Sequence, residues 1–121
     1  MNVLLVEDSD EVREITIEYL QELGHVVHAV ADAEQALAKL LEADFEVVMT
    51  DLSLPGISGI ELARRLNDAY PNLPVVVCSG HPPDKVKLML GGLDRALVLS
   101  KPYDWQELKE VLAAALERRS S

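Results

Sequence analysis

The chain has 121 residues, of which 49% are hydrophobic, so it fits one domain, residues 1–121, with a core large enough to fold without disulfides. Its 21 acidic and 11 basic residues give a net charge of −10, which argues against binding nucleic acid or anionic membranes through a basic patch. The single cysteine, and the lack of any apolar run near the roughly 20 residues of a membrane span, predict a soluble, cytoplasmic protein without membrane insertion.

The first 50 residues alternate between short apolar runs and helical patterns. The runs, which predict strands, cover residues 3–6, 25–30 and 45–50. A helix is predicted from Ser9 to a stop at Gly24. Its apolar stripe consists of Val12, Ile15, Tyr19 and Leu23. Asp32 and Gln35 resemble a capping box that opens the next helix. The residues of this helix expected to face the sheet are Ala36, Leu37, Leu40 and Leu41.

The remainder of the chain predicts three more helices and two more strands. A helix begins at the capping box of Ser58 and Glu61, and the Pro82-Pro83 pair delays a short helix that Gly91-Gly92 ends. Asp104 and Glu107 cap a final helix. The strands cover 74–78 and 96–99, and residues 118–121 are expected to fray. The apolar faces of the three helices are Leu62, Ala63 and Leu66, then Val86, Met89 and Leu90, then Leu108, Val111, Leu112 and Ala115.

Five short strands alternating with five helices predict an α/β fold. Because a helix lies between each pair of successive strands and the loops are short, the strands are expected to be parallel and joined by right-handed crossovers, with helices on both faces of the sheet. The expected architecture is a doubly wound sheet, whose ligand crevice lies outside the carboxyl ends of the strands.

Polar residues follow four of the predicted strands, and parallel strands would bring them to one edge. They are Glu7 and Asp8, then Asp51, then Ser79 and Gly80, then Lys101 and Pro102. Two unit charges about 4 Å apart interact by roughly 4 kcal/mol at an effective dielectric near 20, so three crowded carboxylates require a cation to stay ionised. Hard oxygen ligands favour Mg²⁺, with Mn²⁺ as an alternative, and Ser53 could add its backbone carbonyl.

This ordered set of residues resembles the receiver domain of bacterial response regulators. The resemblance rests on the pair Glu7-Asp8, on Asp51 followed by Leu54-Pro55-Gly56, on Ser79-Gly80 and on Lys101-Pro102-Tyr103, and it spans essentially the whole chain. It implies a flavodoxin-like sheet with the strand order 2-1-3-4-5. It also allows for a receiver of the kind attached to hybrid sensor kinases.

The resemblance assigns a role to each residue at the strand ends. Asp51 becomes the phosphoacceptor from a histidine kinase or a histidine phosphotransfer protein. Ser79 becomes the switch hydroxyl beside the flexible Gly80, Lys101 pairs with the phosphoryl group, and Pro102 follows a cis peptide bond. The Mg²⁺ ligands would be Glu7, Asp8, Asp51 and the Ser53 carbonyl. The chain would act as a switch, with self-catalysed phosphorylation and dephosphorylation only, and not as a turnover enzyme.

One position departs from the family pattern. The residue three before the lysine is often aromatic in receivers, and here it is Val98, which cannot make the inward ring flip that reads out phosphorylation. By resemblance, the surface for a downstream protein is formed by the fourth helix, the fifth strand and the fifth helix. His81 beside Ser79 is a further candidate, for gating or hydrogen bonding.

Structural roles compete with these assignments. Asp51 could belong to a turn, Asp8 and Glu11 could form a capping box, and Lys101 could be a solvated surface lysine. Cys78, inside an apolar strand, is best interpreted as a small core residue.

Other functions remain open at this point. A degenerate receiver would serve as a docking module without phosphorylation. An aspartyl-phosphate phosphatase of the haloacid-dehalogenase type would need a second aspartate two residues after Asp51, where Ser53 stands. A flavin or nucleotide carrier would need a Gly-rich phosphate loop after the first strand, where Glu7-Asp8-Ser9 stands.

Overall fold

The computed structural model describes residues 1–93 and 95–119, with side chains as far as residue 118. Five strands alternate with five helices along these residues. The strands are β1 (Asn2–Val6), β2 (Val26–Val30), β3 (Val47–Asp51), β4 (Val75–Ser79) and β5 (Leu97–Ser100). The helices are α1 (Asp10–Glu22), α2 (Ala33–Glu42), α3 (Gly59–Ala69), α4 (Pro83–Leu90) and α5 (Trp105–Arg119).

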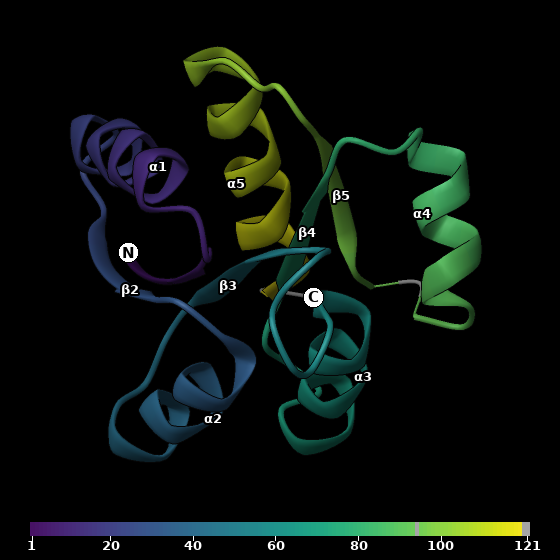
Figure 1. Cartoon of the computed structure of the whole chain (residues 1–121). Coiled ribbons are helices and arrows are strands. Elements are labelled where there is room, and N and C mark those ends of the chain that lie inside the picture. The colour runs from purple at the N-terminus through teal and green to yellow at the C-terminus, as the bar shows by residue number, and fades with distance from the viewer. Residues whose placement is uncertain (94, 120–121) are drawn as a thin grey trace.

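The strands form one parallel sheet in the order β2-β1-β3-β4-β5, which confirms the predicted fold class and strand order. Figure 1 shows helices on both faces of the sheet. Helices α1 and α5 cover one face, where Leu20, Leu108 and Leu112 pack on the buried strands. Helices α2, α3 and α4 cover the other face, around Leu62 and Leu66. Strands β1 and β3, both central, are buried almost throughout.

The capping residues predicted for α2, α3 and α5 are confirmed. The Asp32 side chain accepts a hydrogen bond from the Gln35 backbone N–H, and Ser58 accepts one from Glu61. Asp104 and Glu107 bond reciprocally, as a capping box requires. Helix α1 begins after Ser9, as predicted, and the Ser9 hydroxyl accepts from the Val12 N–H, so the alternative capping box of Asp8 and Glu11 is not formed.

Three apolar residues expected to face the core lie on the surface instead. Ile15 is 50% exposed, Leu41 84% and Met89 39%. Each sits next to the true buried face of its helix, about 100° around from residues such as Leu40 and Leu90. In α1 the fully buried positions are Thr16 and Leu20. The buried face of this helix therefore includes a polar residue and differs from the face predicted from the spacing of its apolar residues.

The last helix reaches nearly to the end of the chain. Helix α5 continues to Arg119, into the segment 118–121 that is expected to fray, and residues 120–121 lie outside the described part. Among the described residues, none of the helices combines the length and the apolar character needed to span a bilayer.

Candidate functional site

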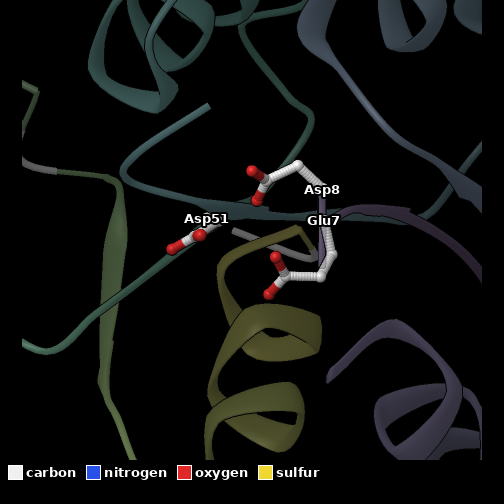
Figure 2. A group of neighbouring side chains, drawn as sticks. All are labelled: Glu7, Asp8 and Asp51. Carbon is white, nitrogen blue, oxygen red and sulfur yellow. The ribbon is translucent and has the colours of Figure 1, made fainter. Parts of the chain in front are cut away.

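Three carboxylates meet where two central strands end. Glu7 and Asp8 directly follow β1, and Asp51 is the last residue of the neighbouring strand β3. Their ligand oxygens all lie within 4.8 Å of one another. Figure 2 shows the three carboxylate groups gathered beside the strand ends, with Asp8 above and Glu7 below in this view. The parallel sheet therefore brings together carboxylates that lie 44 residues apart in the chain.

Asp51 is held in place by its own backbone contacts. The buried Thr50 donates its hydroxyl to the Asp51 carbonyl at 3.0 Å. The N-terminus of α3 packs on the same carbonyl, where a Cβ added at Gly59 would stand only 2.0 Å from the Asp51 oxygen. The Gly59 N–H donates to Leu52 at 2.9 Å. Only a glycine allows this close approach between α3 and the end of β3.

Lys101 lies between two of the carboxylates. Its Nζ is 3.0 Å from Glu7 Oε1 and 3.2 Å from Asp51 Oδ1. Partial burial alone would lower the pKa of Lys101, but the hydrogen bond to Glu7 and the charge of Asp51 outweigh burial and raise it above the usual lysine value. The ammonium is therefore a permanent charge at the site and not a surface lysine free in solvent.

Glu7 is the most fully bonded of the three acids, with a side chain only 5% exposed. Lys101 donates to its Oε1, and the Ser9 backbone N–H donates to its Oε2 at 3.2 Å. The guanidinium of Arg13 donates to the Glu7 carbonyl at 2.9 Å and also pairs with Asp10. Glu7 thus anchors the lysine, whereas Asp8 is solvent exposed.

The remaining predicted residues surround this cluster. Ser79 ends β4 and is 2% exposed; its Oγ accepts the His81 backbone N–H at 3.0 Å. Gly80, His81 and Ser53 are exposed, and within the described residues no hydrogen bond of the His81 ring is found, so only its backbone is tied to Ser79. The peptide bond between Lys101 and Pro102 is cis.

The cluster has the donor set of a hard-cation site. Three carboxylates and one ammonium leave two net negative charges, which one divalent cation would balance. Carboxylate oxygens from Asp8 and Asp51, with waters, match the way Mg²⁺ binds in proteins. The residues present therefore fit the predicted metal.

The contributions that three residues make to this site were not predicted from the sequence. Arg13 supports the Glu7 backbone, Gly59 lets α3 approach Asp51, and Tyr103 bonds to Thr16 on α1. The spacing of Asp10 and Arg13, three residues apart on a helix, indicates an ion pair that would have drawn attention to Arg13. Nothing local signals the other two, because both depend on which elements meet in space.

Cys78 stands opposite Asp51 in the β3–β4 register and is buried. Burial, the largest cause, together with the nearby carboxylates raises the pKa of its thiol to about 12. We expect the native protein to react with a thiol reagent at pH 8 only as fast as it unfolds, because a raised pKa leaves almost no thiolate. Colorimetric thiol titration with and without urea measures this. Rapid labelling without urea would contradict the buried assignment.

Comparisons with known proteins agree on one kind of domain. Residues 3–113 match the sequence family described as response regulator receiver domain. The chain is 38% identical to the two-component response regulator PhoP of Pseudomonas aeruginosa, over 99% of this chain and 53% of that protein. It is 35% identical to the sensor protein TorS of Escherichia coli, over 97% of this chain and 13% of that protein. The chain thus spans about half, or less, of these relatives.

Solved structures share the fold. The chemotaxis response regulator CheY4 of Vibrio cholerae superposes with a TM-score of 0.87 at 27% identity, covering 95% of this chain and 98% of that one. The signal receiver domain of an HD domain-containing protein from Pseudomonas fluorescens superposes with a TM-score of 0.89 at 29% identity, covering 98% of this chain and 88% of that one.

Proposed function

Because the chain belongs to the response regulator receiver domain family, we propose that its Asp51 accepts a phosphoryl group from the phosphohistidine of a sensor kinase or a histidine phosphotransfer protein. The observation that carries this is Asp51 at the end of β3, within 4.8 Å of Glu7 and Asp8 and paired with Lys101 at 3.2 Å. The proposed unit is residues 1–121, acting in the cytoplasm, a reducing compartment that suits its lone buried thiol.

In the proposed step, a carboxylate oxygen of Asp51 forms a bond to phosphorus while the phosphorus–nitrogen bond of the phosphohistidine breaks. The electron pair of that bond leaves with the imidazole, and Asp51 becomes an acyl phosphate. Lys101, already beside Asp51, compensates charge on the transferred oxygens. The Ser79 hydroxyl still has its own proton to donate, because in the described part of the chain its Oγ accepts from the His81 N–H and donates to no other group.

Mg²⁺ or Mn²⁺ would supply further charge neutralisation on the phosphoryl oxygens. Glu7, Asp8, Asp51 and the Ser53 carbonyl are the groups that would hold the ion. Each Glu7 carboxylate oxygen already accepts one hydrogen bond from the protein, so Asp8 and Asp51 offer the more open ligand positions, and Glu7 would hold the ion with the lone pairs that remain.

The new phosphoryl group would bring about −1.5 to −2 of charge and further acceptor oxygens to the strand ends, and Ser79 and Lys101 are the groups placed to respond. We propose that the response reaches a downstream protein through α4, β5 and α5. A groove of about 430 Å³ lies between these elements, bordered by Val98, Leu90 and the cations Lys87 and Arg118. Without an aromatic ring at Val98, the output would depend on the loop and helix from Ser79 to Gly92.

Mg²⁺-dependent phosphorylation is the direct test of this function. We expect incubation with acetyl phosphate and Mg²⁺ to add one phosphoryl group, measured by intact mass, with peptide mapping placing it on Asp51. Chelation of the metal should suppress the gain, because crowded carboxylates then repel the anionic donor. Absence of any gain with both acetyl phosphate and a phosphorylated histidine protein, in a folded sample, would contradict the proposal and favour a docking module.

Two matched variants control for general charge effects. Asp8→Asn removes a carboxylate of the cluster, and the neighbouring Asp10→Asn removes one that pairs with Arg13 outside the cluster. The first should raise the Mg²⁺ concentration needed for half-maximal uptake by about tenfold or more, and the second should leave it nearly unchanged. Equal effects would show that Asp8 acts only through overall charge.

A phosphatase of the haloacid-dehalogenase type is less well supported. The position two residues after Asp51 holds Ser53, an exposed residue without the acid–base capacity of a second aspartate. Sustained hydrolysis of a phosphomonoester by the isolated chain would revive this alternative.

A further inference from the structure

Thr16 is a buried polar residue on the inner face of α1, and it is only 1% exposed. A hydroxyl in this apolar layer is costly unless it forms a hydrogen bond. Its Oγ1 lies 2.7 Å from the Tyr103 hydroxyl, a contact between residues 87 apart in the chain. The bond therefore links α1 to the connection between β5 and α5. Helices α1 and α5 lie on the same face of the sheet (Figure 1).

Tyr103 lies two residues after Lys101, so the bond acts on the segment that carries the lysine. The Tyr103 phenol is protonated at neutral pH, and burial raises its pKa further, to about 12. At the other end of the segment, the Lys101 N–H donates to the Ser79 carbonyl at 2.7 Å. The Lys101 backbone is thus fastened on both sides, to β4 and to α1.

Helix α1 also holds the partner of that lysine. Arg13, one turn before Thr16, donates to the Glu7 carbonyl at 2.9 Å. One helix therefore sets the position of Glu7 through Arg13 and of the Lys101 segment through Thr16. A lysine side chain has four flexible carbons and loses much rotamer entropy when it is fixed, so a well-placed backbone is needed to keep Nζ on two carboxylates.

We propose that the Thr16–Tyr103 hydrogen bond is a positioning contact that holds the Lys101 ammonium between Glu7 and Asp51. Its effect on phosphoryl uptake rests on the function proposed above, whereas its effect on the order of the Lys101 side chain does not. Thr16 and Tyr103 touch none of the reacting atoms and act through Lys101.

The test compares Thr16→Val and Tyr103→Phe with Tyr19→Phe as the matched control. Tyr19 borders the same groove of about 320 Å³ as Thr16 and Tyr103, but its hydroxyl makes no hydrogen bond within the described residues. NMR relaxation of the Lys101 side chain in the unphosphorylated protein should show lower order in the first two variants and unchanged order in the control. The rate of uptake from acetyl phosphate should fall about threefold to tenfold, the range expected for one neutral hydrogen bond.

A second set of variants separates positioning from general destabilisation. In a Lys101→Met background, Tyr103→Phe should cause no further loss of rate, because the group it positions is gone. Thr16→Ser, which keeps the hydroxyl, should preserve both the order and the rate. Unchanged Lys101 order in Thr16→Val and Tyr103→Phe, or an equal loss of rate in the Lys101→Met background, would overturn the proposal. If the wild-type chain takes up no phosphoryl group, the proposed function fails while the Lys101 order still decides this inference.

Discussion

Replacing Asp51 by asparagine is expected to abolish phosphoryl uptake, with a loss of more than about a thousandfold in rate. The amide keeps the size of the side chain but is no nucleophile toward phosphorus, so binding alone remains. Intact-mass analysis after exposure to acetyl phosphate, and to a phosphorylated histidine protein, measures the effect. Asp68→Asn, which neutralises an exposed aspartate on α3, is the control and should behave as the wild type.

The same substitution should not unfold the protein. Asp51 is one of three crowded carboxylates that share a single ammonium, so removing its charge relieves repulsion while it weakens one ion pair. We expect the free energy of unfolding to change by no more than about 1 kcal/mol in either direction. A phosphorylated Asp51→Asn protein would show that another group is the acceptor, and a large loss of stability would show that Asp51 is mainly structural.

Replacing Gly59 by alanine is expected to destabilise the protein by about 2–4 kcal/mol. The new Cβ would lie 2.0 Å from the Asp51 oxygen and 2.9 Å from the Asp51 carbonyl carbon and the Leu52 Cα, all of them backbone atoms that cannot rotate aside. Helix α3 would have to move and would lose the hydrogen bond from Gly59 to Leu52. The gain in helix propensity, about 1 kcal/mol, is too small to offset this.

Urea unfolding measures the effect, with Gly92→Ala as the matched control. A Cβ at Gly92 meets nothing within 4 Å, and its backbone does not need a positive φ, so the free energy of unfolding should change little there. Because α3 packs on the carbonyl of Asp51, Gly59→Ala should also slow phosphoryl uptake under conditions where the variant is folded. A Gly59→Ala protein as stable as the wild type would contradict the close packing.

The strand-end carboxylates could be predicted from the sequence because each depends on a local pattern. An apolar run followed by an acid fixes Glu7 and Asp51 at strand ends, and a parallel sheet brings those ends together. Burial within a helix was less predictable. Helix α2 carries more apolar residues than its inner face can hold, so Leu41 was assigned to a core that Leu40 already fills.

Contacts between distant polar groups could not be predicted at all. From the sequence, Thr16 is only a polar residue within a helix. Its hydrogen bond is with Tyr103, 87 residues away, and no local pattern predicts that contact. The close packing at Gly59 could not be predicted either. Glycine occurs at helix starts for several reasons, and the sequence does not show that the Asp51 carbonyl packs against this one.

Strand β5, which leads directly into Lys101, lies at the edge of the sheet. This strand is four residues long, pairs on one side only, and leaves Leu97 and Val98 partly exposed, whereas the carboxylates stand on the two central strands. Edge elements open in partial unfolding events that cost less than global unfolding. We expect openings of β5 to withdraw the Lys101 ammonium while the three carboxylates stay together, and amide hydrogen exchange in this strand measures how often that happens.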